Sequence, residues 1–204
     1  LADEILDQIL PAFKPEVLSS THRYKYMTNK LRRIGKRAAW IMVEQIKAGK
    51  FRPDRFEVEF DDNPDSDLSP ISIDLPEGQV KIRGKIDRVD LYEDGDKAYV
   101  RVIDYKTGNA DFKLSDVYHG FEIQLIVYLD ALLANKEILA KKDLYPAGIF
   151  YFKIDDPKIP INKNNAGDME RTLMSTLKLK GRLVKDIDIA KAMDMITEKG
   201  KWSP

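Results

Sequence analysis

Three polar side chains in the stretch from Val80 to Gly108 have the types and spacing of a metal-dependent reaction centre. Asp87 lies in one strand-like run, and Asp104 and Lys106, spaced Asp-x-Lys, lie in the next. Two converging carboxylates can bind one divalent cation through their oxygens. A lysine beside them can hold an anionic group or a water molecule by a charge-assisted hydrogen bond. The residues therefore predict a metal or phosphate site, provided that the chain brings the three side chains to one surface.

The two runs are expected to pair as an antiparallel hairpin, because Asp94-Gly95 between them is a strong turn signal. If Asp94 and Gly95 form the turn, Asp87 lies diagonal to Asp104. If Gly95 and Asp96 form it, Asp87 faces Asp104 directly. Side chains alternate between faces along a strand, so either register puts both aspartates and the lysine on one face. A slip of one residue would separate them.

A second interpretation of these charges stays open, since charged side chains on one face of a hairpin are often only its solvated side. Val100 and Val102 continue the same face, which indicates that this face is buried. Buried carboxylates need a partner or a metal. The apolar neighbours therefore favour a site over a solvated surface.

The composition is that of a globular chain, with 204 residues, 43% hydrophobic and 33% charged residues, and a formal net charge of zero. No apolar run approaches the ~20 residues that span a bilayer. The acidic start resembles no signal peptide, so we expect a cytoplasmic location and no membrane partner. The absence of cysteine excludes disulfides and thiolate metal sites. Zero net charge means that any affinity for DNA must come from an uneven distribution of charge.

A helix is predicted from the cap cluster at 19–21 to about Ala48, with Gly49 as its C-cap. Apolar residues recur on one side at three- and four-residue steps, at Met27, Leu31, Ile34, Ala38 and Ile41. The other side is basic and carries the candidate nucleic-acid contacts Arg33, Lys36 and Arg37. A basic face can track DNA phosphates, although a merely solvated helix face is the alternative.

Strands are expected at 51–60, 71–75 and 146–154 besides the hairpin, and a second helix from Ser115 to about Lys136. The buried stripe of that helix is predicted to contain Val117, Phe121, Leu125, Tyr128 and Leu132. Further helices are expected within 169–183 and 187–197. The order of elements predicts an α/β fold with a mixed β-sheet flanked by helices. We divide the chain into an N-terminal helical segment with a basic face (1–50), a core (51–155) and a C-terminal helical extension (156–204) that looks truncated.

Three segments in fixed order carry a resemblance to a known family: GKIDRVD (84–90), VIDYKTG (102–108) and QLIVYLDAL (124–132). Together they resemble the RecB-family branch of the PD-(D/E)XK nucleases, most closely the nuclease domain of AddB-type helicase–nuclease subunits. The resemblance runs from about Leu18 to about Ile154. It implies a restriction-endonuclease-like core and a DNA exonuclease that processes double-strand ends in recombinational repair. The implied partners are a single strand from an unwound duplex end and a second helicase–nuclease subunit.

The resemblance also implies roles for single residues. Asp87, Asp104 and Lys106 would be catalytic, and the two aspartates and the backbone carbonyl of Tyr105 would bind the metal. Hard oxygen ligands without His or Cys favour Mg²⁺ or Mn²⁺ over Zn²⁺. Gln124 and Tyr128, from the Q-x-x-x-Y motif, would help to hold the nucleic acid.

The sequence departs from the family in two respects. The upstream G-x-x-x-H motif is not found, and the cysteines that bind an iron–sulfur cluster in AddB-type domains are absent, so this chain cannot hold the cluster. Both departures put the activity of the isolated chain in doubt. Two alternatives stay open: a nuclease-like domain that only binds single-stranded DNA, and a free-standing RecB-like (CRISPR-associated) exonuclease. No Walker motif is present, so a motor would lie elsewhere.

Overall fold

The computed structural model describes residues 4–6, 8–9, 22–108, 111–139, 142–158 and 169–194. They fall into two compact units. One unit contains the described residues of Leu1–Lys47 and Ile154–Lys178, and the other those of Ala48–Lys153 and Leu179–Ser203. The predicted helix cap at 19–21 and the last residues of the helix predicted within 187–197 lie outside the described residues.

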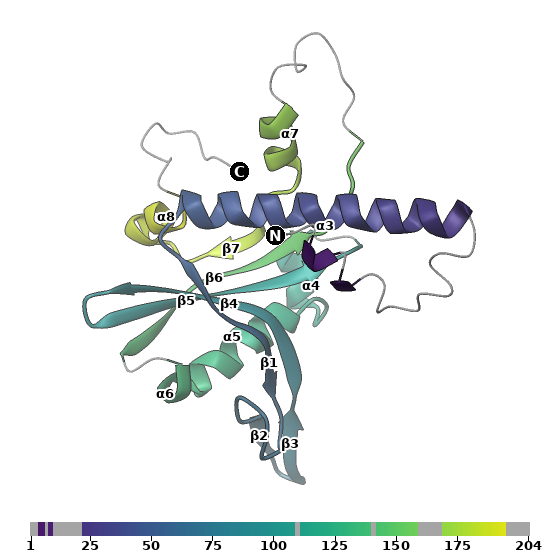
Figure 1. Ribbon diagram of the computed structural model, residues 1–204. Helices are drawn as coiled ribbons and strands as arrows, with labels where there is room; N and C mark the ends of the chain where they lie inside the picture. The colour runs from purple at the N-terminus through teal and green to yellow at the C-terminus, as the bar shows by residue number, and fades with distance from the viewer. Residues whose placement is uncertain are drawn as a thin grey trace. The chain divides into compact units, whose positions relative to one another are not determined.

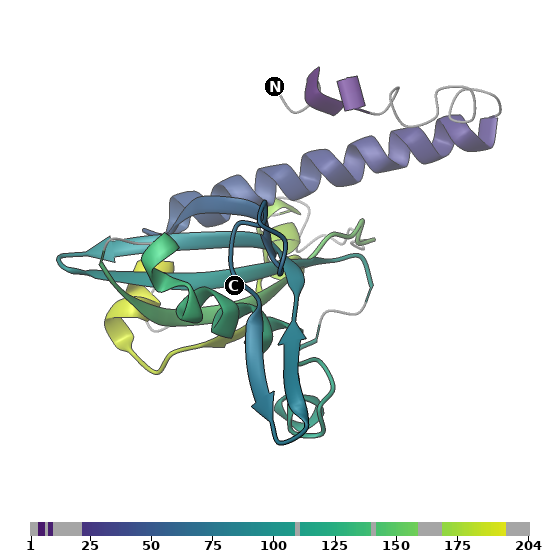
Figure 2. The ribbon, with the colours of Figure 1, turned by 90° about the horizontal axis from the view of Figure 1, so that it is seen from below.

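The second unit is built on a five-stranded mixed sheet of order β1-β4-β5-β6-β7 (Figure 1). Its β5 and β6 are parallel, and the other neighbours are antiparallel. The strands are β1 (Arg52–Phe60), β4 (Gly84–Asp94), β5 (Lys97–Lys106), β6 (Asp143–Lys153) and β7 (Lys180–Leu183). A separate pair, β2 (Ile71–Leu75) and β3 (Gly78–Ile82), projects away from this sheet (Figure 2). The predicted mixed α/β sheet is confirmed.

Helices follow both faces of the large sheet. Between the parallel strands β5 and β6 run α4 (Leu114–Tyr118), α5 (Gln124–Ala134) and α6 (Lys136–Leu139), and α8 (Ile187–Met193) follows β7. The larger core lies where α5 packs on Val89, Val100 and Val102. Residues of the other sheet face, such as Tyr99, pack with Phe51 and α8. The two faces are thus both covered, as expected for a sheet with a parallel pair.

The hairpin at the centre of the sheet adopts the second of the two predicted registers. Asp94 pairs with Lys97, so Gly95 and Asp96 form the turn. Gly95 has φ 57°, a left-handed conformation that glycine adopts without steric cost. This register continues toward direct opposition of Asp87 and Asp104.

The helix predicted from Ser115 to Lys136 is wrong as a continuous element. It breaks between α4 and α5, where Gly120 and Glu122 have φ values of 80° and 54°. Left-handed residues cannot continue a right-handed helix. Phe121 was predicted to be buried, but it lies in this break and is 67% exposed. Leu125, Tyr128 and Leu132 in α5 are buried as predicted.

The helix predicted within 169–183 is only partly correct. Its first half forms α7 (Met169–Thr176), whereas Lys180–Leu183 forms β7 on the edge of β6. A Cβ on Gly181 would lie 1.9 Å from the backbone oxygen of Ile149. Glycine is therefore required here, because two strand backbones approach closely at that point.

The first unit contains α3 (His22–Ala48, with its last residue in the second unit) and α7. The predicted helix is confirmed over its described length. Its apolar stripe is buried only in the C-terminal half: Ala38 and Ile41 are buried, whereas Met27 and Leu31 are exposed. No helix among the described residues is long and apolar enough to cross a bilayer.

Candidate active site

The two aspartates meet where the pairing of β4 and β5 ends. The last paired residues are Arg88 and Ile103. One step further, Asp87 Oδ2 accepts a hydrogen bond of 2.7 Å from the backbone N–H of Tyr105. A side chain thus takes the place of a ladder acceptor, and this fixes the Asp87 carboxylate beside the strand that carries Asp104.

Lys106 is held by groups from three elements. Its Nζ lies 2.7 Å from Asp104 Oδ2 and donates a 2.8 Å hydrogen bond to Gln124 Oε1 of α5. It also lies 5.2 Å from the ring centroid of Tyr151 on β6, a cation–π distance. Gln124 Nε2 donates in turn to the Tyr128 hydroxyl at 2.6 Å. The Q-x-x-x-Y pair therefore binds Lys106 directly, a contact that the sequence motif did not predict.

Tyr151 is a site residue that the sequence did not single out. It pairs with Asp104 across the parallel strands β5 and β6 and is 3% exposed. Burial raises its pKa to about 12, with further increases from the negative charges of Glu122 and Asp104. A parallel register joins strands about forty residues apart, and no local pattern predicts it. Tyr151 stays protonated at neutral pH and offers its ring face to Lys106.

The Asp104 carboxylate is buried and incompletely satisfied. Burial is the largest cause that raises its pKa; Lys106 opposes the shift, and the charge of Asp87 adds to it. Asp104 Oδ2 contacts Lys106 as an ion pair but accepts no hydrogen bond of good geometry from the described residues. Buried polar atoms in native proteins seldom lack such a partner. An oxygen in this condition next to a second carboxylate fits a hard divalent cation.

The other polar residues of the hairpin form a structural cluster. Arg88 donates to both oxygens of Asp90 at 2.6 and 2.8 Å, and Arg101 donates to Asp90 at 2.9 Å. All three are at most 3% exposed. They lie on the sheet face opposite Val100 and Val102, because residues alternate along β5. Arg88 and Asp90, both within the GKIDRVD segment, thus tie β4 to β5 below the site.

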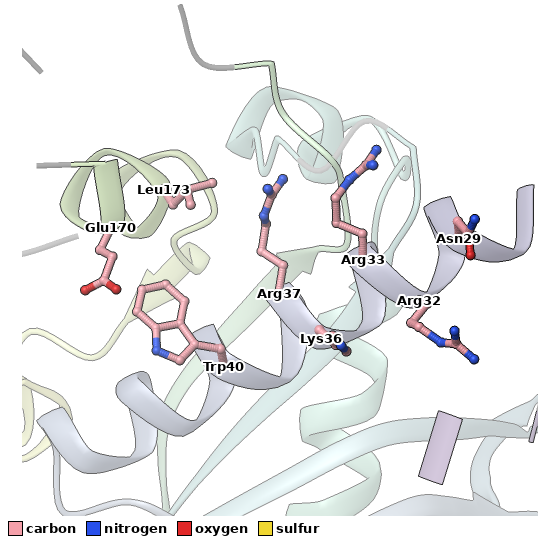
Figure 3. Close-up of a pocket in the computed structure, with 8 residues that line it drawn as sticks. All are labelled: Asn29, Arg32, Arg33, Lys36, Arg37, Trp40, Glu170 and Leu173. Atoms are coloured by element: carbon pink, nitrogen blue, oxygen red, sulfur yellow. The ribbon is translucent and has the colours of Figure 1, made fainter. Parts of the chain in front are cut away.

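The basic side chains predicted to contact nucleic acid are engaged within their own unit. Arg37 Nη1 lies 2.6 Å from Asp156 Oδ1, and Arg33 binds the same carboxylate through Nε at 3.1 Å and through Nη2. Hydrogen bonding to Arg33 is the largest cause that lowers the pKa of Asp156. Figure 3 shows Arg33 and Arg37 projecting from the same side of α3, in a pocket of about 620 Å³ that Lys36 also lines.

An Asp104→Asn variant is expected to be more stable than the wild type at neutral pH when no divalent ion is present. The raised pKa means that the charged form is disfavoured in the folded state. The resulting destabilisation is full above the folded pKa and vanishes below the unfolded one. The gain from asparagine, about 2–4 °C in melting temperature for each kcal/mol, should therefore fade as the pH falls.

Thermal melting with and without 5–10 mM Mg²⁺, concentrations chosen for a weak site, checks this prediction. Mg²⁺ should raise the melting temperature of the wild type and leave that of Asp104→Asn unchanged. An asparagine variant that melts below the wild type at neutral pH, or that responds equally to Mg²⁺, would contradict it.

The chain is similar to known nucleases over nearly all of its length. The profile of the PD-(D/E)XK nuclease superfamily matches residues 1–198. Three similar proteins, each named as the ATP-dependent helicase/deoxyribonuclease subunit of type B, come from Alkaliphilus oremlandii (strain OhILAs), Clostridium tetani (strain Massachusetts / E88) and Thermoanaerobacter sp. (strain X514). They are 43%, 45% and 41% identical over 94%, 93% and 93% of this chain. The chain spans only 17%, 16% and 16% of their lengths.

Proposed function

This chain belongs to the PD-(D/E)XK nuclease superfamily, and from that premise we propose that it is the metal-dependent deoxyribonuclease domain of a helicase–nuclease that processes double-strand DNA ends. The single observation that carries the proposal is the meeting of Asp87, Asp104 and Lys106 at one end of the sheet, with a buried Asp104 oxygen that accepts no good hydrogen bond from the described residues. We assign the catalytic core to residues 51–155, which contain all of these groups.

The proposed metal ligands are Asp87, Asp104 and the backbone carbonyl of Tyr105. A bound Mg²⁺ or Mn²⁺ would activate the attacking water and neutralise charge on the phosphoryl oxygens. Asp87 Oδ2 is occupied by the Tyr105 N–H, which leaves its second oxygen for the ion. The described residues contain no group of three or more His, Cys, Asp or Glu side chains suited to a metal. We therefore expect weak binding of a hard ion that keeps some of its water molecules, as is usual for Mg²⁺.

Lys106 is the proposed phosphate-binding group. Its ammonium carries three N–H donors, and Asp104, Gln124 and the Tyr151 ring face restrict where they can point. A donor held in position before the substrate arrives stabilises developing negative charge without reorganisation. Gln124 and Tyr128 then act mainly by orienting Lys106, and we propose that any contact they make to the nucleic acid is made from that position.

The finer features of the substrate are part of the same proposal. We propose that the domain acts as an exonuclease on one strand of an unwound end, beside a partner subunit and in the cytoplasm, where bacterial DNA is found. Arg33, Lys36 and Arg37 are the proposed phosphate contacts of α3. A phosphate would have to share Arg33 and Arg37 with Asp156, which already binds both.

Metal removal tests the proposal on the full polypeptide that carries this chain. A 5′-labelled single strand should be cut in Mg²⁺ or Mn²⁺, and excess EDTA should stop cleavage completely because two carboxylates and a lysine do not replace the ion. Readdition of Mg²⁺ should restore cleavage. Nucleotides or short products that accumulate from one end indicate an exonuclease, whereas cleavage that persists in EDTA would contradict the assignment.

A further inference from the structure

The two most exposed large hydrophobic side chains of the described residues lie next to the candidate active site. Tyr118 is 87% exposed and Phe121 67% exposed. They are three residues apart, and Phe121 precedes Gln124, the ligand of Lys106, by three residues. We call this pair the aromatic rim. Exposed aromatic groups of this size usually mark a surface that binds something.

The backbone that presents the aromatic rim is folded in a specific way. The Phe121 N–H donates to the Asp116 carbonyl at 2.8 Å, and the Gly120 N–H donates to the Val117 carbonyl at 3.0 Å. Glu122 has φ 54°, a conformation that costs free energy for a residue other than glycine. A continuous helix would have avoided that cost and buried Phe121. The fold instead keeps this ring outside, immediately before the helix that holds Lys106.

Charge indicates which part of a nucleic acid the aromatic rim fits. Residues 114–123, read as LSDVYHGFEI, include Asp116 and Glu122 but no Lys or Arg. A surface that tracks phosphates needs Lys and Arg, so this segment does not suit the sugar–phosphate backbone. Aromatic rings can stack on the π-face of an unpaired base of any sequence. Lys106 lies close by to attract the phosphate.

We propose that Tyr118 and Phe121 stack on the bases of a single DNA strand next to the phosphate that Lys106 holds. The inference rests on the proposed nuclease function and makes it more specific: the substrate must have unpaired bases at this position. A paired duplex cannot expose its base faces, so the aromatic rim would select single strands. It would also hold the strand by its bases while the chemistry proceeds at the backbone.

A comparison of rings and bases tests the proposal on the full polypeptide, without ATP, so that no motor moves the strand. The variants are Tyr118→Ala and Phe121→Ala, and the readout is kcat/KM for Mg²⁺-dependent cleavage of a labelled single strand. Each variant should lose about fivefold or more on a normal strand. On a strand whose residues near the cleavage point are abasic, the loss should disappear, since there is no base to stack.

Matched variants separate stacking from general damage. Phe121→Tyr and Tyr118→Phe keep a ring and should retain wild-type kcat/KM. Tyr145→Ala removes a 40% exposed ring near the start of β6, away from the Asp104–Tyr151 pair, and should have no base-dependent effect. Melting temperatures should stay unchanged, because both rim rings are exposed.

Two outcomes would overturn the inference. Equal losses on normal and abasic strands would mean that the rings act on the fold or bind a protein segment, and the absence of any loss would mean that they do not bind the strand. The Lys106→Ala variant distinguishes this from failure of the nuclease proposal. If Lys106→Ala abolishes cleavage while the rim variants show no base dependence, only the rim inference is wrong.

Discussion

Lys106→Ala is expected to lower metal-dependent cleavage by about a thousandfold or more, the upper range for loss of one preorganised donor at a reacting oxyanion. Asp87→Ala and Asp104→Ala should have effects at least as large, because each removes a proposed metal ligand. The fold should survive all three changes, since Asp87 and Lys106 are only partly buried and Asp104 carries an unfavourable buried charge. Initial rates on a labelled single strand in Mg²⁺, with circular dichroism for the fold, measure this.

A matched control is available on a neighbouring strand. Lys180 on β7 forms a 2.6 Å ion pair with Asp111, but both side chains are 40% or more exposed. Lys180→Ala removes the same kind of side chain and the same kind of pair without touching the site, so cleavage should stay within about twofold, as expected for loss of an exposed ion pair. Lys106→Ala and Lys180→Ala variants with equal activity would show that Lys106 is not part of the reaction centre.

The sequence predicted the candidate site because strand alternation alone was sufficient. Both registers of the hairpin put Asp87, Asp104 and Lys106 on one face, so the choice between them did not matter. The buried Val100 and Val102 confirm that this is the inner face. The hydrogen bond from Tyr105 to Asp87 was not predictable, because it occurs only where the ladder ends.

Other features depended on contacts or dihedral angles that a sequence pattern does not encode. The four-residue spacing of Val117, Phe121 and Leu125 is helical, yet the backbone at Gly120 and Glu122 turns Phe121 outward. The strand at Lys180–Leu183 has little β propensity and exists because β6 offers an edge on which only glycine fits at 181. Tyr151 reaches the site through a parallel pairing with no local signature.

Asp90→Ala is expected to destabilise the fold by about 3–5 kcal/mol, the cost of leaving buried charges without their partner. Asp90 is 0% exposed and binds both Arg88 and Arg101, whose side chains are 3% and 4% exposed. Without Asp90, two guanidinium groups would remain buried side by side, and burial already lowers the pKa of Arg101. Urea-induced unfolding, followed by circular dichroism, measures the change.

The comparison with a surface pair gives this last prediction its meaning for the nuclease motif. Asp62 forms a 2.7 Å pair with Lys81, but the two side chains are 63% and 41% exposed, so Asp62→Ala should cost less than about 1 kcal/mol. If Asp90→Ala is equally mild, the buried cluster does not stabilise the hairpin. If it is severe, the loss of cleavage in this variant reflects unfolding, and adding denaturant to the wild type should reproduce it. Asp90 would then share a segment with Asp87 because the reacting carboxylate needs a rigid strand pair beneath it, and not because both aspartates bind the metal.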